Sequence, residues 1–164
     1  MNVRRCQAPD VAAVATLLDE ATVWVGQRGY EHWPLPFPWE EIAAAIDRGE
    51  VYVVESEDGD GVATVSMLPD DPEYWGDQPP DAFYVHKLAV RRDQAGRGIG
   101  AAIVEWANAE AAEAGREFLR LDCLGRRRDL GLRLGLSPLF LGSLGRAEEL
   151  RERPFTHARA APRH

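Results

Sequence analysis

The stretch QAGRGIGAAIVEWANAEAAEAG, residues 94–115, places three glycines at alternate positions directly before a long helical pattern. The largely apolar residues FYVHKLAV at 83–90 precede it and predict a central strand. A strand, a glycine-rich turn and a helix start would bring several unpaired backbone N–H groups to one point, where the helix dipole adds partial positive charge. Glycine permits positive φ and a close approach of the backbone. The pattern therefore predicts a binding site for phosphate groups.

Three kinds of phosphate-binding loop could use this arrangement, and two of them fit poorly. A P-loop needs a lysine and a Ser or Thr after the glycines, whereas Ala101 and Ala102 stand here. A dinucleotide-binding fingerprint needs the spacing GxGxxG, whereas the spacing here is GxGxG. The third kind, a loop that binds coenzyme A, is compatible with the glycines.

Outward from this stretch, hydrophobic periodicity predicts further strands and helices. The expected strands cover residues 3–8, 51–56, 61–68, 83–90 and 118–124. The expected helices open at Pro9, at Trp39 and after the glycines, and the second ends near Arg48, before Gly49. The third helix should bury a face made of Ile99, Ala102, Ile103, Trp106 and Ala109. Residues 69–82 are expected to form a loop.

The order of these elements predicts the fold class. A strand, a helix and a strand over residues 83–124 favour a parallel pair with a right-handed crossover. The two strands over 51–68, joined by EDGDG, favour an antiparallel hairpin. We therefore expect an α/β fold with a mixed, mostly antiparallel central sheet and helices on both faces.

Composition excludes several classes of protein. The net charge of −8 argues against nucleic acid as a partner. No apolar run approaches the roughly 20 residues of a membrane span, and the residues MNVRRCQAPD at the start lack the apolar core of a secretory leader. Two cysteines without CxxC spacing indicate neither a disulfide framework nor a metal site. We expect a cytoplasmic protein.

The last 40 residues differ from the rest of the chain. Residues 1–124 carry 10 Lys and Arg against 23 Asp and Glu, whereas residues 125–164 carry 9 Arg against 4 acidic residues. The segment 125–164 also lacks Val, Ile, Tyr, Trp and Lys. It is too short for a second domain, so we expect one domain over 1–164 with a divergent C-terminal segment. From about residue 145 we expect this segment to be irregular or packed against a neighbouring molecule, not a regular β-hairpin that completes the sheet. An ordinary divergent tail and a reading frame shifted near Gly125 explain this composition equally well.

The chain resembles the GNAT superfamily of N-acetyltransferases. The residues LAVRRDQAGRGIGAA, at 88–102, match the family's coenzyme A motif, and LRLDC at 119–123 is similar to its fifth strand. The resemblance covers about residues 1–124. One departure is local, because the motif's Gln or Arg falls on Ala95, with Gln94 one place early.

The resemblance implies acetyl-CoA as the acetyl donor. The fourth and fifth strands of the family diverge, and the thioester lies between them. The coenzyme would be bound mainly through the backbone. The residues that contact it, together with their immediate neighbours, would be Leu88, Ala89, Val90, Ala95, Gly96, Arg97, Gly98, Ile99, Gly100 and Ala101. The implied reaction moves an acetyl group to the primary amine of a small molecule by direct attack, without an acyl-enzyme. The alternative is a GNAT-like module that binds acetyl-CoA but has lost turnover.

A second departure lies after the fifth strand. The family usually carries an Asn there, followed by a Tyr that protonates the leaving thiolate. Here Arg126–Arg128 stand at the expected position of the Asn, and Leu130 or Gly131 at that of the Tyr. The general acid therefore stays unassigned.

His86 and Tyr84 are the candidate catalytic residues. His86 lies in phase with Tyr84 and Leu88 on the expected strand, where it could take a proton from the acceptor amine. A structural histidine and a packed tyrosine are the alternatives.

Aromatic and acidic residues gather in the loops that should flank the acceptor. The aromatic ones are Trp33, Trp39, Tyr74 and Trp75, and the acidic ones are Glu40, Glu41, Asp70, Asp71 and Glu73. Together they predict a site for a cationic amine, against the alternative of ordinary loop packing and solvated charge. A homodimer in which a partner chain completes the sheet is left open.

Overall fold

A computed structural model describes residues 1–29, 33–124 and 148–153 of the chain. Helices and strands follow one another in the expected order, with short additional elements. The strands are β1 (Asn2–Arg5), β2 (Val51–Glu55), β3 (Gly61–Leu68), β4 (Ala82–Val90), β5 (Phe118–Leu124) and β6 (Glu148–Arg153). The helices are α1 (Val11–Gly26), α2 (Trp39–Asp47), α3 (Pro72–Trp75) and α4 (Ile99–Glu113), with 3₁₀ turns η1 (Ala8–Asp10) and η2 (Arg92–Gln94).

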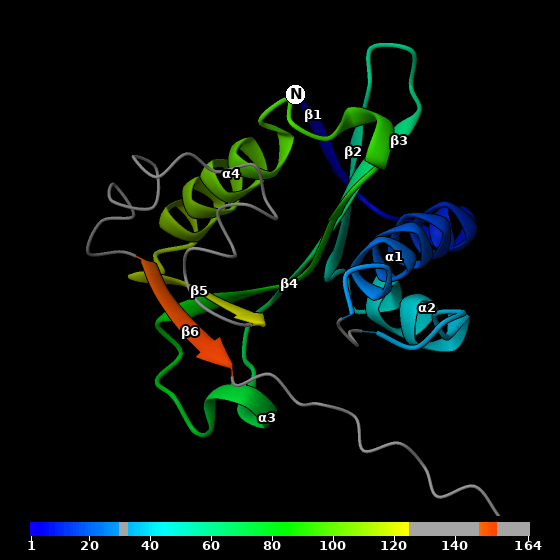
Figure 1. The fold of residues 1–164 in the computed structure, drawn as a ribbon. Coiled ribbons are helices and arrows are strands. Elements are labelled where there is room, and N and C mark those ends of the chain that lie inside the picture. The colour runs from blue at the N-terminus through cyan, green and yellow to red at the C-terminus, as the bar shows by residue number, and fades with distance from the viewer. Residues whose placement is uncertain (30–32, 125–147, 154–164) are drawn as a thin grey trace, which may run out of the picture.

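The strands form one six-stranded sheet in the order β1-β2-β3-β4-β5-β6. The pairs from β1 to β4 are antiparallel, and β5 runs parallel to both β4 and β6. Figure 1 shows α1 and α2 on one face of the sheet and α4 on the other. The predicted fold class, a mixed and mostly antiparallel sheet covered on both faces, is confirmed.

Two separate apolar clusters hold these layers together. Under α4, Ile103, Val104 and Ala107 pack against Val65 and Leu119 of the sheet. On the opposite face, Val14 and Leu18 of α1 and Ile42 of α2 pack against the sheet. Their partners there are Val51 and Val53 of β2 and Ala89 of β4. Burial of both faces supplies the main driving force for this three-layer arrangement.

The face that α4 buries differs from the predicted one. Ile103 is buried as expected, but Ala109 is exposed, and the buried residues include Gly100, Val104 and Ala107. Small residues on this stripe let the helix lie close to the sheet. Trp106 flanks the stripe and contacts the Tyr52 ring edge-on, with 4.9 Å between centroids.

Three further differences have local causes. The first strand ends at Arg5 rather than residue 8, because the N–H of Gln7 donates to the Asp10 carboxylate and the chain turns into η1. The expected loop 69–82 contains α3, whose four residues are too few to show periodicity. Residues Glu148–Arg153 are not irregular, because they form β6 parallel to β5, but no antiparallel hairpin is seen within the described residues of this segment. The rest of the segment beyond residue 145 lies outside the described residues.

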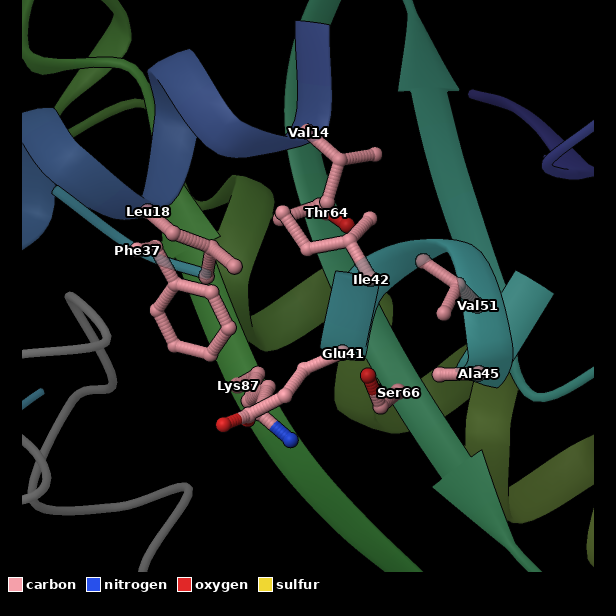
Figure 2. Close-up of a pocket in the computed structure, with 10 residues that line it drawn as sticks. All are labelled: Val14, Leu18, Phe37, Glu41, Ile42, Ala45, Val51, Thr64, Ser66 and Lys87. Atoms are coloured by element: carbon pink, nitrogen blue, oxygen red, sulfur yellow. The ribbon is translucent and has the colours of Figure 1, made fainter. Parts of the chain in front are cut away.

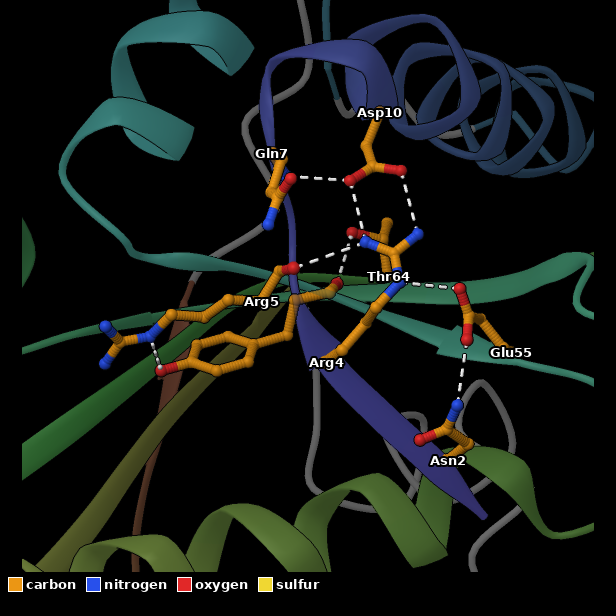
Figure 3. A network of polar contacts seen from close by, with 8 residues as sticks. Asn2, Arg4, Arg5, Gln7, Asp10, Glu55 and Thr64 are labelled. Carbon is orange, nitrogen blue, oxygen red and sulfur yellow. Dashed lines mark hydrogen bonds and ion pairs between the residues drawn. The ribbon is translucent and has the colours of Figure 1, made fainter.

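A polar network ties the edge strand β1 to its neighbours (Figure 3). The Arg4 guanidinium donates twice to the Asp10 carboxylate, at 2.8 and 2.9 Å, and once to Glu55, at 2.6 Å. Glu55 also accepts from the Asn2 amide at 2.8 Å. The Arg4 side chain holds the pKa of the Asp10 carboxyl below its ordinary value through these hydrogen bonds. The network fixes β1 against β2.

Candidate active site

The glycine-rich turn between β4 and α4 adopts a left-handed backbone at two of its three glycines. Gly96 has a φ of 79° and Gly98, which caps α4, a φ of 78°. A Cβ built on either residue would meet no other atom within 4 Å. Both residues therefore border open space in a conformation that side chains disfavour, which suits the close approach of a ligand.

The start of α4 adds backbone donors beside this turn. The N–H of Ala102 donates to the Gly98 carbonyl at 3.0 Å, which is the first helical bond. The helix therefore offers no acceptor to the N–H groups of Ile99, Gly100 and Ala101. Gly100 is buried in the first turn without a positive φ, so its lack of a side chain serves packing rather than turn geometry.

The exposed flank of the same turn is formed by Ala95 and Arg97. The N–H of Ala95 closes η2 by donating to the Arg92 carbonyl. The side chain of Arg97 stands between the two left-handed glycines in the sequence. A positive side chain and a row of N–H groups at a helix start make this region suited to an anion.

Strands β4 and β5 diverge next to the turn. Their pairing ends at Val85 and Leu121, although β4 continues to Val90. The N–H of Arg91 donates to the carbonyl of Val62 on β3. Because the backbone N–H and C=O groups of successive strand residues point alternately to the two edges, those of Leu88 and Val90 point away from β3, toward the gap between β4 and β5. The groups of Ala89 are directed to β3 instead, and its side chain is buried under α1 and α2.

Helix α1 holds the segments on either side of this opening through two consecutive carboxylates. Glu20 accepts a hydrogen bond from the backbone N–H of Arg92, at 2.9 Å, just before the glycine turn. Asp19 accepts one from the N–H of Phe37, at 2.7 Å, just before α2. The guanidinium of Arg92 lies over the indole of Trp24, with 4.2 Å between the guanidinium carbon and the centroid of the ring. The same helix therefore positions both loops.

His86 of β4 forms a pair with a buried acid. Its Nε2 lies 2.9 Å from Oδ2 of Asp71, and the two side chains are 13% and 5% exposed. The other carboxylate oxygen of Asp71 caps α3 by accepting from the N–H of Tyr74. The Tyr74 ring lies 5.8 Å from the His86 ring. Asp71 thus orients the imidazole and brings an aromatic ring beside it.

Tyr84 is buried and its hydroxyl is engaged by a neighbouring arginine. It is 2% exposed, and its hydroxyl accepts from Arg120 at 2.8 Å. Arg120 lies opposite it on β5, is also buried and donates to Asp81 at 3.0 Å. The Trp75 ring contacts Tyr84 at 5.9 Å. This cluster closes the side of the site where β4 and β5 are still paired.

The remaining predicted aromatic residues lie near α2. The Trp33 ring contacts the buried Phe37 ring edge-on at 6.2 Å, and Trp39 is 53% exposed at the start of α2. A small pocket lies between α1, α2, β3 and β4 (Figure 2), with a cavity volume of about 10 Å³, which is room for about one water molecule. Phe37 and Lys87 line it together with Ser66. Of the four predicted aromatic residues, the structure brings Tyr74 and Trp75 to His86 and Tyr84.

The model of the acetyltransferase (GNAT) family matches residues 14–127. The chain belongs to the GNAT family. This confirms the resemblance inferred from the glycine-rich motif. Acetyl-CoA is the typical co-substrate of the family.

Individual relatives agree with this assignment. The chain is 31% identical over 123 residues to "Uncharacterized N-acetyltransferase YesJ" of Bacillus subtilis (strain 168), covering 70% of this chain and 68% of that protein. A GNAT family acetyltransferase of Listeria monocytogenes 4b F2365 shares the fold, with a TM-score of 0.68, 24% identity and coverage of 82% and 84%. A GNAT family acetyltransferase of Brucella melitensis, solved in complex with acetyl-CoA, has a TM-score of 0.55, 18% identity and coverage of 79% and 80%.

Three features of this GNAT site were missed in the sequence. Asp71 was expected to attract a cation but is the partner of His86. Arg120 gave no signal, because a lone arginine in an apolar strand resembles a surface position. Lys87 interrupts the apolar pattern of the residues in β4, and this interruption was the sign in the sequence of the positive φ at Lys87.

Within residues 1–29, 33–124 and 148–153, no group of three or more His, Cys, Asp or Glu side chains is arranged to hold a metal ion. No helix in this part of the chain is both long and apolar enough to cross a membrane. The positions expected to hold the family's Asn and Tyr, Arg126–Arg128 and Leu130 or Gly131, lie outside the described residues.

Proposed function

We propose that this protein transfers the acetyl group of acetyl-CoA to the primary amine of a small molecule. One observation carries the proposal: Gly98 caps α4 in a left-handed conformation and borders open space, in the turn that follows the stretch of β4 no longer paired with β5. Such a turn suits a pyrophosphate, and the adjacent strand edge suits the extended arm of a coenzyme.

The coenzyme would be held mainly by the main chain. The N–H groups of residues 96–101 would bind the pyrophosphate, and the backbone of Leu88 and Val90 would bind the pantetheine arm as an added strand does. Charge-assisted hydrogen bonds from backbone donors to a phosphate are about twice as strong as neutral ones. Arg97 adds a positive charge that is not required for the geometry.

His86 would act as the base for the acceptor. Asp71 lies against Nε2 and would stabilise the positive charge that the imidazole gains when it takes up a proton. The neutral amine nitrogen then attacks the thioester carbonyl carbon and the C–S bond breaks. The nitrogen loses its second proton to give the neutral amide, and coenzyme A leaves as a thiolate that takes up a proton. The donor of that proton is not assigned. Tyr84 supports this site by packing, since its hydroxyl is engaged by Arg120.

The test is to mix the protein with acetyl-CoA and a panel of primary amines and to follow free thiol. Release of coenzyme A that depends on an amine, with acetylated amine found by mass spectrometry, is the expected result. Calorimetric binding of acetyl-CoA without thiol release would favour the alternative of a non-catalytic module. Absence of binding would refute both.

Three wider expectations stay predictions. Residues 1–164 are proposed to form a single domain, with 125–164 as its divergent part. A cytoplasmic location and a homodimer are likewise untested by the fold. Size-exclusion chromatography with light scattering would measure the assembly directly.

A further inference from the structure

Strand β4 contains a bulge at Lys87. From Ser66 to Thr64, β3 advances by two residues, whereas the paired stretch of β4, from His86 to Ala89, advances by three. Lys87 takes up the extra residue with a φ of 50° and is the one residue other than glycine with positive φ in the described part of the chain. A long side chain in this conformation costs about 1–2 kcal/mol, which is commonly retained where function requires it.

The bulge turns two consecutive side chains to the same face of the sheet. His86 lies opposite Ser66, and Ser66 and Lys87 line the same pocket on the α1 and α2 side. Leu88 instead packs with the cluster under α4, so the predicted phase of His86 with Leu88 is wrong. In a regular strand His86 and Lys87 would point to opposite faces. Here a base and a cation lie side by side.

The surroundings of Lys87 do not neutralise its charge. Its ammonium group lies 5.8 Å from the centroid of the buried Phe37 ring. Within the described part of the chain, Lys87 forms no ion pair or side-chain hydrogen bond. Glu41, an exposed residue of α2, lines the same pocket (Figure 2). A half-buried ammonium group that lies against an aromatic ring can bind an anion through a charge-assisted hydrogen bond.

We propose that Lys87 binds a carboxylate of the acceptor, so that the acceptor is an amino acid or a closely related amino carboxylate. The inference rests on the proposed acetyltransferase function and names its substrate class. An amino acid carries its amine and its carboxylate on neighbouring carbons, which matches a base and a cation on neighbouring residues. The expectation of a purely cationic acceptor weakens, because Asp71 is engaged by His86.

The experiment compares amino acids with their amides. Both keep the reacting amine, and only the amino acid keeps the carboxylate. With the parent protein we expect kcat/KM to be at least about 10-fold higher for a preferred amino acid than for its amide, since one charge-assisted contact is lost. Equal values for acid and amide across the panel would overturn the proposal.

Variants at position 87 then test the residue itself. Lys87→Met should lower kcat/KM for the amino acid by about 10-fold to 100-fold and leave the amide nearly unchanged, whereas Lys87→Arg should keep most of the preference. Lys87→Gly should lose the preference without a lower melting temperature, because glycine adopts positive φ without strain. Arg48→Met, which removes an exposed cation paired with Glu50, should not change the preference.

Two measurements separate the possible failures. Binding of acetyl-CoA by calorimetry tests the proposed function independently of the acceptor. Binding of the amino acid and of its amide to the protein loaded with coenzyme A tests Lys87 even if turnover is slow. An amino acid that binds no better than its amide, or a Lys87→Met variant that loses both alike, would assign Lys87 to packing against Phe37.

Discussion

Glu20 on α1 accepts a hydrogen bond from the backbone N–H of Arg92, at 2.9 Å and across 72 residues of sequence. Its neighbour Asp19 holds the N–H of Phe37 in the same way. One helix turn therefore fixes the entrance to the proposed coenzyme loop and the segment beside the proposed acceptor pocket. The two carboxylates should have separable effects.

Glu20→Ala should raise the Kd for acetyl-CoA by about 10-fold, because the turn before Gly96 loses its anchor and binding must order it. Asp19→Ala should instead raise KM for the acceptor and leave the coenzyme Kd close to that of the parent. Glu20→Gln retains an oxygen acceptor and should recover much of the loss. If both alanine variants changed coenzyme and acceptor binding to the same extent, a general loss of stability would explain them better.

His86 and Asp71 give a second prediction. His86→Gln should lower kcat by about 10²-fold to 10⁴-fold, the usual range for loss of a general base, without weakening acetyl-CoA binding. Asp71→Asn should lower kcat by less, about 10-fold, because the amide oxygen can still cap α3 while the negative charge beside His86 is lost. Steady-state kinetics and calorimetry measure both quantities. A His86→Gln protein with the parent's kcat would remove histidine from the mechanism.

Tyr84→Phe distinguishes packing from catalysis. The change removes the hydroxyl that accepts from buried Arg120, so the free energy of unfolding should fall by about 1–3 kcal/mol. Turnover of the folded variant should stay within a few-fold of the parent, because the hydroxyl is engaged away from the opening. Urea denaturation and kinetics together decide the matter. A 100-fold loss of kcat at unchanged stability would restore Tyr84 to the catalytic residues.

The ion pair of Arg4 and Asp10 predicts a dependence of stability on pH. Its hydrogen bonds lower the pKa of Asp10, so the ionised carboxylate stabilises the folded state above the ordinary value near 3.8. As pH falls through and below that value, the unfolded state takes up the proton first and this stabilisation is lost. Asp10→Asn should lower the free energy of unfolding by about 1 kcal/mol or less at pH 7, because the pair is partly exposed.

The same comparison at low pH provides the control for Asp10. The difference between parent and Asp10→Asn should shrink as the pH is lowered below about 4, since protonation removes the charge from the parent as well. A difference that stays constant from pH 7 to pH 3 would show that the charge of Asp10 contributes nothing.

The sequence predicted those parts of the fold that local pattern determines. The strand at 83–90, the glycine turn and the helix from Ile99 follow from periodicity and from the backbone freedom of Gly96 and Gly98. The bulge at Lys87 could not be predicted, because an extra residue in one strand is visible only against the register of its neighbour. That single residue also reversed the expected phase of Leu88.

The candidate site was predicted in composition but not in pairing. Asp71 and His86 were both singled out, yet their contact depends on α3, a helix of four residues between loops. Tyr84 is a candidate from the sequence because it lies in phase with His86 on the expected strand. Its burial depends on Arg120, which lies 36 residues away and pairs with it only through the parallel register of β4 and β5.

The central claim is that the left-handed turn at Gly98 exists to bring backbone N–H groups against the pyrophosphate of acetyl-CoA. The most direct test is calorimetric titration of acetyl-CoA into Gly98→Val, with Gly115→Val as the matched control. Gly115 has a φ of 69° and equally open surroundings, but it follows the opposite end of α4. Both changes impose similar strain, and circular dichroism confirms folding. We predict that Gly98→Val weakens binding by about 3–6 kcal/mol, or roughly 10²-fold to 10⁴-fold in Kd, whereas Gly115→Val binds like the parent. A folded Gly98→Val protein with the parent's affinity would contradict the proposed coenzyme site.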